Sequence, residues 1–289
     1  MALEDEFGDI ILKARAGLGL SVDFVSKETG INKMEITQLE ALARKPTPEQ
    51  VEAFSRLLHL NSARLMDIAF HRYIPRPVPS FLSQHILTVL GYIGTYEVKG
   101  YLIVDPATKE TAMVDTAYNP EGMINAISQN GLKLKYILLT HTHHDHMGGI
   151  DKIREKLDVP IYVSREEVGQ LGKTWDSSKD RLVKEGESIS VGNLTLKILH
   201  TPGHTPGGTG YICQRPDLSF GFFGDAIFAG SLGRAYATIS YPQLIESVRT
   251  KILTLSEETV LFPGHGPATT VGEEKKRNPF FNETEEQPA

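Results

Sequence analysis

The sequence predicts an α+β protein in which a small all-α domain precedes a sandwich of two β-sheets enclosed by helices, an αββα arrangement. Three observations predict this class. Residues 1–72 show apolar residues at helical spacing, residues 73–80 are rich in proline, and residues 81–289 alternate strands and helices in two similar halves. A chain of 289 residues is long enough for one large and one small domain.

Helix signals divide residues 1–72 into five short helices. The residues from Asn32 to Glu35 have the N-cap and N3 chemistry of a capping box. The residues from Thr47 to Gln50 form a fuller box with proline at the first helical position. Gly30 ends the second helix, and we expect Ser62 to cap the fifth one.

The helical part resembles the helix-turn-helix of the Cro and phage-repressor family. The resemblance rests on Leu20-Ser21, Phe24-Val25, Gly30-Ile31, Ile36, Leu39-Glu40 and the segment from Ala43 to Pro48. It implies that the helix from Asn32 to Leu39 enters the major groove of DNA. The DNA contacts that it implies are Lys33, Thr37, Gln38, Arg44 and Lys45.

The charge of the helical part argues against strong DNA binding. Residues 1–72 hold nine lysines and arginines against eleven aspartates and glutamates, a net charge of −2. Affinity for DNA depends largely on neutralising phosphates, so a basic face is expected of a DNA reader. A module that forms a homodimer or covers an active site is therefore the alternative to a DNA-binding domain.

A proline-rich segment joins the two parts of the chain. Three alternating prolines between Tyr73 and Ser80 favour a semi-rigid spacer.

The composition of the whole chain excludes several classes of protein. The chain has 40% hydrophobic residues and a net charge of −6, which gives no general attraction to nucleic acid or anionic membranes. No apolar run approaches the ~18 residues of a membrane span, and the N-terminus lacks signal-peptide features. The single Cys213 cannot form an internal disulfide, so we expect a cytoplasmic protein.

Four histidines and an aspartate are crowded into the segment from Thr140 to His146, directly after an apolar run that ends at Leu139. His141 and His143 can point to the same side of an extended backbone and so share one metal ion. A turn after them would direct the next aspartate and histidine toward a second metal ion. The segment therefore predicts a metal site at the end of a strand.

Three further candidate ligands follow the same pattern downstream. His204, Asp225 and His265 each come after a strand-like apolar run and a glycine or proline break. One such residue alone is usually structural. Together with the histidine-rich segment they predict four strand ends that meet at one edge of a sheet.

These motifs resemble the metallo-β-lactamase fold in their HxHxDH spacing and in the later histidines and aspartate. Within that superfamily, four segments resemble the glyoxalase II-like hydrolases over roughly residues 82–281. The segments are Gly203 to Gly207, Phe223 to Asp225, Ser231 to Arg234 and Pro263 to Glu274. The resemblance implies the αββα fold and a hydrolase with two divalent metal ions per chain.

The resemblance also implies how the ligands are shared. Metal one takes His141, His143 and His204, metal two takes Asp145, His146 and His265, and Asp225 bridges them. Asp115 supports the histidine loop by hydrogen bonding. Nitrogen and carboxylate ligands suit zinc, which we expect first, and also iron or manganese.

The implied chemistry is hydrolysis of a small thioester or ester by a hydroxide held between the metal ions. Asp145 is the implied catalytic residue, since it can steer the proton of the water as well as bind metal. Arg234 either holds a substrate carboxylate or braces its own loop. We expect Tyr236 and Tyr241 to line the pocket. Glyoxalase II holds glutathione with a C-terminal helical domain, but only 24 residues follow His265, so glutathione recognition is not implied.

Two other functions fit the same residues. A persulfide dioxygenase-like oxidoreductase shares the HxHxDH loop and uses one iron at His141, His204 and Asp225. A DNA-binding regulator would use the helical part to read DNA and the sandwich to sense a ligand.

Overall fold

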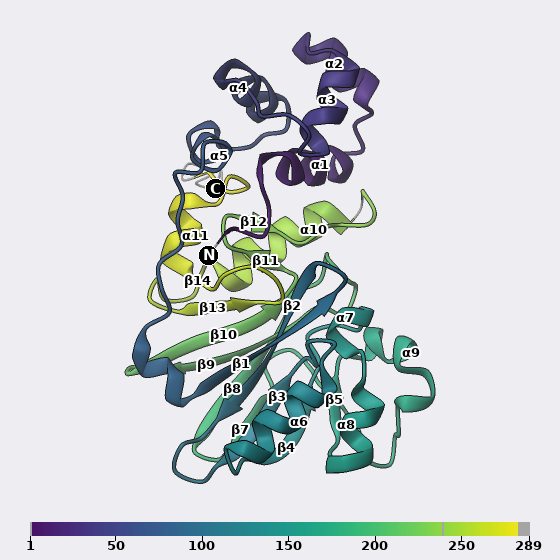
Figure 1. Cartoon of the computed structure of the whole chain (residues 1–289), viewed down its shortest axis with the longest axis vertical. Helices are drawn as coiled ribbons and strands as arrows, with labels where there is room; N and C mark the ends of the chain where they lie inside the picture. Colours follow the sequence, from purple (N-terminus) through teal and green to yellow (C-terminus); the bar gives the residue numbers. More distant parts are fainter. Residues whose placement is uncertain (1, 239, 283–289) are drawn as a thin grey trace.

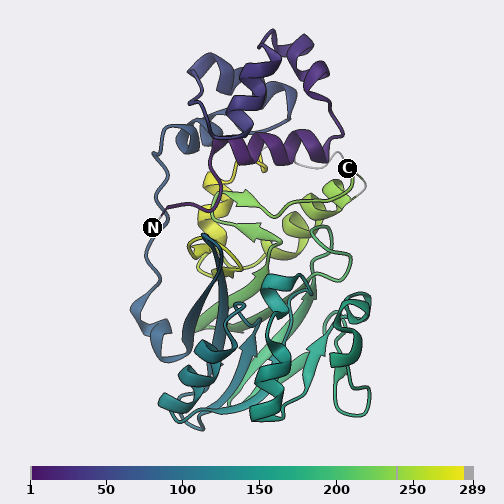
Figure 2. The same ribbon diagram turned by 45° about the vertical axis from the view of Figure 1, so that its right-hand side comes forward.

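The computed structural model describes residues 2–238 and 240–282. These residues form an elongated molecule, with a helical domain at one end and two facing sheets at the other (Figure 1). The segment that joins them runs along one side of the molecule (Figure 2). The predicted α+β class and the αββα sandwich are confirmed.

The helical domain contains the five predicted helices. The predicted N-cap Asn32 is confirmed, whereas its capping box with Glu35 and the predicted cap Ser62 are wrong. Asn32 accepts a hydrogen bond from the Met34 N–H, but the carboxylate of Glu35 binds Arg44 and Gln50 instead of closing a capping box. Asn61, and not Ser62, caps the fifth helix, because the Asn61 side chain reaches the Arg64 N–H. The helices are α1 (Phe7–Gly17), α2 (Val22–Thr29), α3 (Lys33–Glu40), α4 (Pro48–Leu57) and α5 (Ser62–Ala69).

The first sheet has its strands in chain order, antiparallel at first and parallel from β3 onward. One part of the prediction fails here. Within the segment from Lys173 to Lys184, predicted as loop, Arg181–Leu182 forms strand β6 and pairs with β5. The strands are β1 (Ile86–Ile93), β2 (Tyr96–Val104), β3 (Glu110–Val114), β4 (Lys133–Leu138), β5 (Ile161–Val163) and β6.

The second sheet has the order β14-β13-β10-β9-β8-β7, and only β10 and β13 run parallel. A small separate hairpin follows β10. The strands of the sheet are β7 (Ser188–Val191), β8 (Leu194–His200), β9 (Thr209–Arg215), β10 (Leu218–Gly224), β13 (Val260–Pro263) and β14 (Thr269–Thr270), and the hairpin is β11 (Ile227–Phe228) with β12 (Ser231–Leu232).

Helices cover the outer faces of both sheets (Figure 1). The sequence from Gln243 to Leu255 has the apolar pattern of a helix. In the structure this helix begins earlier, at Ser240, and ends as the π-helical turn Val248–Ile252. Short 3₁₀ turns occupy Ser80–Gln84, Arg165–Glu167 and Gly172–Thr174. The helices are α6 (Pro120–Gln129), α7 (His144–Met147), α8 (Ile150–Leu157), α9 (Val168–Leu171), α10 (Ser240–Ser247) and α11 (Val271–Arg277).

Three apolar clusters follow from these layers. The first fills the space between the sheets and includes Tyr211 and Phe222. The second packs α6 and α8 against the first sheet. The third joins the outer side of the second sheet to the helical domain without a break, from Phe54 in α4 to Leu261 in β13. The helical domain therefore shares a hydrophobic core with the sandwich and is packed against it.

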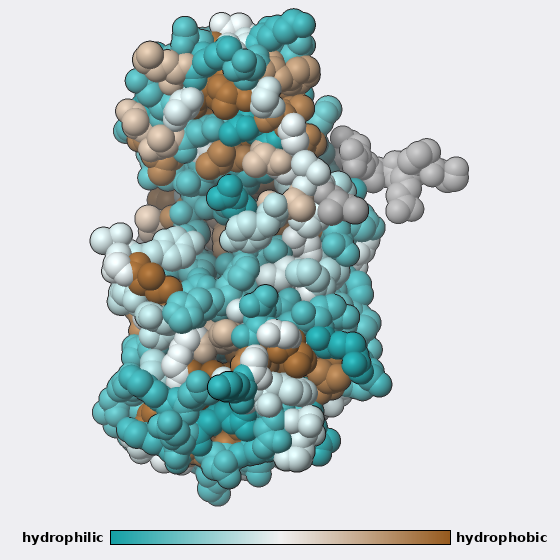
Figure 3. Space-filling view, turned by 90° about the vertical axis from the view of Figure 1, so that its right-hand side faces the viewer, coloured by the Kyte–Doolittle hydropathy of each residue, from teal (hydrophilic) through white to brown (hydrophobic). Residues whose placement is uncertain are grey.

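Within residues 2–238 and 240–282, no helix is both long and apolar enough to cross a bilayer. On the face in Figure 3 hydrophobic residues form scattered patches among hydrophilic ones. Scattered exposed apolar residues are ordinary for a protein surface.

Candidate metal centre

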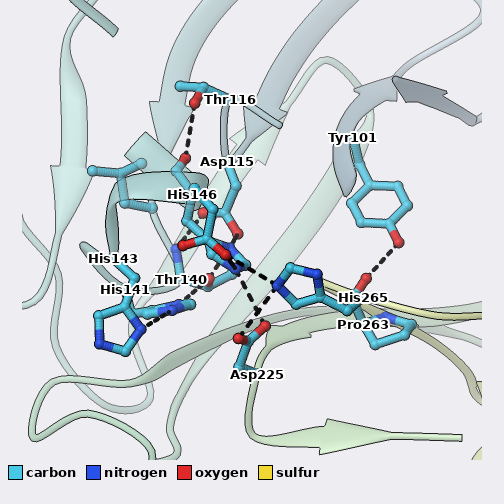
Figure 4. Close-up of polar contacts among 12 residues, drawn as sticks. Tyr101, Asp115, Thr116, Thr140, His141, His143, His146, Asp225, Pro263 and His265 are labelled. Atoms are coloured by element: carbon cyan, nitrogen blue, oxygen red, sulfur yellow. Dashed lines mark hydrogen bonds and ion pairs between the residues drawn. The ribbon is translucent and has the colours of Figure 1, made fainter. Parts of the chain in front are cut away.

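The structure brings all seven predicted ligands together at one edge of the sandwich. The loop after β4 and the short helix α7 provide four of them, and the segments that follow β8, β10 and β13 provide the others. Figure 4 labels His141, His143, His146, Asp225 and His265. The ligands form three groups, each with ligand atoms within 4.8 Å of one another. These groups are His141, His143 and His204; Asp145, His146 and His265; and His141, His146 and Asp225.

The first group matches the ligand set predicted for metal one. His143 Nδ1 lies 3.1 Å from His141 Nε2 and 3.0 Å from His204 Nε2. Three imidazole nitrogens so close together are an arrangement that a shared cation stabilises. His144, by contrast, is exposed and its ring packs against Tyr118, so it points away from this group.

The second group matches the set predicted for metal two. Asp145 Oδ2 lies 3.1 Å from His265 Nε2 and 3.7 Å from His146 Nε2. Asp225 lies between the groups: its Oδ1 is 3.2 Å from His146 Nε2, and its Oδ2 is 3.5 Å from both His204 Nε2 and His265 Nε2. Asp225 is therefore placed to bridge two ions.

Two buried polar atoms in this centre lack hydrogen-bond partners in the described part of the chain, which indicates whether the residues suit metal ions. Among the residues that the structure describes, His146 Nε2 and Asp225 Oδ1 are buried and have no hydrogen-bond partner. Buried polar atoms are nearly always satisfied. A cation between a nitrogen and a carboxylate oxygen would satisfy both atoms, so the residues present fit a metal centre.

In three of the five candidate histidines, a hydrogen bond at one ring nitrogen sets the other nitrogen toward the centre. His146 Nδ1 donates to Asp115 Oδ2 at 2.8 Å, His204 Nδ1 donates to the Arg234 carbonyl at 2.8 Å, and His265 Nδ1 donates to the Glu97 carbonyl at 2.6 Å. Such bonds fix the tautomer that leaves Nε2 for a metal ion.

Asp115 supports the histidine loop as predicted. Its carboxylate accepts hydrogen bonds from the Thr140 N–H at 2.9 Å and from the Thr140 hydroxyl at 2.7 Å, besides the bond from His146. Asp115 has a φ of 55°, in the left-handed region that non-glycine residues seldom adopt. The network of bonds holds this strained backbone in place.

Electrostatics keep His141, His204 and Asp225 in the forms that bind metal. Burial lowers the pKa of the His204 imidazole to about 4 and that of His141 well below its usual value, so both are neutral. Burial alone would raise the pKa of Asp225, but His146 and His265 outweigh it and hold that pKa well below its usual value. Neutral imidazoles and an ionised carboxylate are the forms that coordinate cations. By contrast, the Asp225 carboxylate overcomes the effect of burial at His146 and His265 and raises the pKa of both imidazoles, so a cation would have to displace their protons.

Sequence reasoning missed Glu167, a buried carboxylate behind the first group. It accepts hydrogen bonds from the N–H and hydroxyl of Thr142 and from the Gly207 N–H. Ser164, just before it, donates to the Gly207 carbonyl. In the sequence, the pair Glu166-Glu167 has the pattern of an exposed helix start, and no local signal separates the buried residue from the exposed one.

Aromatic side chains surround the centre. Tyr96 is 48% exposed and its ring lies 4.6 Å from that of His265. Tyr236 is 66% exposed, with its ring centre 5.6 Å from that of His143, and the Arg234 guanidinium lies 5.8 Å from the Tyr236 ring. The prediction for Tyr241 is wrong: it is buried against Phe280 in the core shared with the helical domain.

The residues predicted to contact DNA lie on the helical domain, away from this centre. All five are exposed, but two of them are in ion pairs, Lys33 with Asp23 at 2.8 Å and Arg44 with Glu35 at 2.6 Å. The predicted contacts are Lys33, Thr37, Gln38, Arg44 and Lys45.

Comparison with known proteins identifies the family. The model of the metallo-beta-lactamase superfamily matches residues 94–265, which include every candidate ligand. The chain belongs to this superfamily. The helices α1–α5 lie outside the matched residues.

Individual superfamily members resemble the sandwich closely. The hydroxyacylglutathione hydrolase GloC of Haemophilus influenzae is 34% identical over 189 residues, which are 60% of this chain and 88% of that protein. The crystal structure of TTHA1623 in a di-iron-bound form is 30% identical, with a TM-score of 0.56 over 68% of this chain and all of that one. That of ETHE1 from Myxococcus xanthus is 26% identical, with a TM-score of 0.55 over 67% of this chain and 83% of that one.

Proposed function

We propose that this superfamily member is a metal-dependent hydrolase of small thioesters or esters, of the hydroxyacylglutathione hydrolase type. The observation that carries the proposal is Asp225, whose carboxylate reaches both ligand groups: its Oδ2 lies 3.5 Å from His204 of the first group, and its Oδ1 lies 3.2 Å from His146 of the second. An arrangement that bridges two cations suits hydrolysis, because both the attacking and the departing oxygen or sulfur need charge stabilisation.

The residues of the chain divide this task. His141, His143 and His204 would hold one ion, Asp145, His146 and His265 would hold the other, and Asp225 would bridge them. When bound, a pair of divalent ions lowers the pKa of water and polarises the carbonyl that is attacked. Burial opposes ionisation of Asp145, but its hydrogen bond with His265 lowers its pKa, so Asp145 is ionised and can accept the proton of the attacking water.

A thioester fits this centre better than an amide. The sulfur of a thiol leaving group has a pKa near ~8.5 and departs without prior protonation. An amide needs a positioned general acid for its nitrogen, and the described ligand groups contain no spare acid beyond those assigned to metal. Thioester hydrolysis therefore needs no general acid beyond the residues present.

The relative named GloC bears on the question of glutathione. Its match to this chain covers 88% of its length, so a protein little longer than the sandwich bears the name hydroxyacylglutathione hydrolase. The proposal of a glutathione thioester therefore does not depend on a C-terminal helical domain. The exposed Arg234 and Tyr236, next to His143 and His204, are our candidates for binding the anionic end of such a substrate.

Metal analysis with a turnover assay tests the proposal. We expect two metal ions per chain, zinc first and iron or manganese as alternatives, and hydrolysis of S-lactoylglutathione that chelation abolishes and added metal restores. Asp225→Asn should lose both the second ion and turnover, whereas Asp217→Asn, in an exposed ion pair with Arg215, should change neither. Full turnover in a metal-free preparation would refute the proposal.

A persulfide dioxygenase-like reaction is the second candidate, supported by the HxHxDH loop from His141 to His146 that it would share. It would need one iron at His141, His204 and Asp225. Oxygen uptake with glutathione persulfide and a single iron per chain would favour it over hydrolysis. Two ions per chain without oxygen uptake would exclude it.

DNA binding by the helical domain, with the sandwich as ligand sensor, remains a further proposal. The exposed Gln38 and Lys45 favour it, but the ion pairs of Lys33 and Arg44 neutralise much of the charge that phosphates require. A gel shift with random oligonucleotides at stated salt tests it, and gel filtration tests the proposed homodimer. The buried, unpaired Cys213 suits a reducing compartment, so we place the enzyme in the cytoplasm.

A further inference from the structure

The hairpin β11–β12 lies between the metal centre and the helical domain (Figure 1). On one side it follows Asp225 directly and leads into Gly233, where an added Cβ would lie 1.7 Å from the Asp225 carbonyl oxygen and 3.0 Å from His204 Nδ1. The backbone at the base of the hairpin is therefore packed against two candidate ligands. A shift of the hairpin would displace them.

On its other side the hairpin is held by Lys13 of α1. The Lys13 ammonium donates to the Leu232 carbonyl at 2.8 Å and to Asp5 at 2.5 Å, and Asp5 also accepts a bond from the Ser231 hydroxyl. Only 15% of the Lys13 side chain and 7% of the Asp5 side chain are exposed. A charge pair so buried is costly unless every group is bonded, and here both charges are bonded to the hairpin.

Lys13 also reaches the ring that packs on a candidate ligand. Its ammonium lies 4.8 Å from the centre of the Phe228 ring, and Phe228 packs edge-on to His265 with ring centres 5.9 Å apart. A cation over an aromatic face is attracted by the ring. Lys13 thus fixes the side chain that supports His265 from the side of the helical domain.

The segment before α1 contacts the loop that contains His265. Glu4 packs on Gly266, where an added Cβ would lie 2.7 Å from Glu4 Cβ. Although burial raises the pKa of the Glu4 carboxyl group overall, Tyr96, whose ring centre lies 4.6 Å from that of His265, also interacts with this group and helps to lower its pKa. The first helix and the segment before it therefore contact the metal-two side of the centre at two separate points, Phe228 and the loop of His265.

We propose that Lys13 is a positioning residue of the metal centre, through which docking of the helical domain and binding of the metal ions stabilise each other. The helical domain then supports the metal centre from the outer side of the hairpin. Linkage makes the effect reciprocal: if the docked domain raises metal affinity, bound metal must hold the domain more firmly in place. The proposal goes beyond the hydrolase reaction, and its test needs no substrate.

The first experiment compares zinc binding by Lys13→Met and Arg15→Met in the full-length chain. Met keeps the apolar length of Lys13 and removes its charge. Arg15 lies on the same helix but pairs with Glu40 inside the helical domain, so its loss weakens that domain without touching the hairpin. We expect Lys13→Met to weaken zinc binding about tenfold or more, as partners of metal ligands typically do, and Arg15→Met to leave it within about threefold.

The second experiment uses the wild-type chain alone, so it holds even if Lys13→Met fails to fold. Hydrogen exchange of backbone amides is measured with saturating zinc and with a chelator. We expect slower exchange with zinc in α1 and in the hairpin β11–β12, and no change in α4, which is distant from the hairpin. Equal exchange of α1 in both samples, or zinc binding by Lys13→Met as tight as that of Arg15→Met, would overturn the proposal. A wild-type chain that binds none of zinc, iron and manganese would refute this proposal and the hydrolase together.

Discussion

The carboxylate of Glu167 accepts a hydrogen bond of 2.9 Å from the backbone N–H of Thr142, the residue between His141 and His143. The same carboxylate accepts a second bond of 2.9 Å from the Gly207 N–H, in the loop that contains His204. One buried side chain therefore ties together the two loops that provide all three candidate ligands of metal one. Its negative charge also lies behind that group of ligands, where it favours a cation.

Replacing Glu167 by Gln should remove this tie while preserving the size of the side chain. An amide has one acceptor oxygen, so its NH₂ group must face either the Thr142 or the Gly207 N–H, both of which are donors. We expect zinc affinity at site one to fall about 10- to 100-fold while site two still fills. Zinc titration followed by metal counting measures this.

Glu166 provides the matched control, because it is the exposed neighbour of the buried glutamate. Glu166→Gln should bind both ions as the wild type does. Two tightly bound ions in Glu167→Gln would show that the carboxylate has no positioning role.

Gly264 should be intolerant of any side chain. A Cβ at this position would lie 2.4 Å from both Asp225 Oδ1 and His146 Cε1, the two groups that meet at the bridging position. Gly264→Ala should therefore push these ligands apart and abolish binding of the second ion, with little loss of secondary structure. Gly169→Ala is the control, since a Cβ there meets nothing within 4 Å. Circular dichroism and metal counting on both variants check the prediction, and normal metal content in Gly264→Ala would contradict it.

Glu274 should make stability depend on pH. Burial raises the pKa of its carboxyl from the usual 4.5 to about 7, despite hydrogen bonds from Thr269, Asn278 and the Gly230 N–H. Between these two pH values the unfolded chain ionises this group and the folded chain does not. The contribution of Glu274 to the free energy of unfolding should thus be highest below about pH 4.5. It should fall by about 3 kcal/mol as the pH rises toward 7.

Urea unfolding of metal-free wild type and Glu274→Gln at pH 5 and pH 8 isolates this contribution. Gln does not titrate, so the wild type should lose more stability than the variant between the two pH values. Glu258→Gln, an exposed glutamate, should behave as the wild type does. Equal losses in wild type and Glu274→Gln would show that the carboxyl does not titrate in this range.

The meeting of the candidate ligands was predictable, because the segments that carry them follow strands, and the strands of a sheet end at a common edge. His141 to His146 lie in one segment, and His204, Asp225 and His265 each follow a glycine or proline break. Local rules sufficed for these positions, and likewise for the capping box at Thr47.

The partners that fix those ligands were not predictable, because their contacts cross large distances in the chain. Glu167 is 25 residues from Thr142 and 40 from Gly207, and Lys13 is 219 residues from Leu232. A buried glutamate or lysine has the same local pattern as an exposed one. The capping error at Ser62 has a similar cause, since Asn61 and Ser62 are both good caps and the contact of Asn61 with Pro279 decides between them.

Arg234 should determine the affinity for an anionic substrate and not the rate of the chemical step. Its guanidinium is exposed beside Tyr236, whereas its backbone carbonyl holds His204 and is kept in any variant. Arg234→Met should raise KM for S-lactoylglutathione about tenfold, the value of one charge-assisted hydrogen bond, and leave kcat within about threefold. A neutral thioester such as an S-acyl N-acetylcysteamine should show little change in KM, because it offers no carboxylate to the guanidinium. Arg215→Met, in an ion pair with Asp217 at a distant turn, should affect neither substrate. Equal rises in KM for both thioesters would mean that Arg234 braces its loop instead of binding the substrate carboxylate.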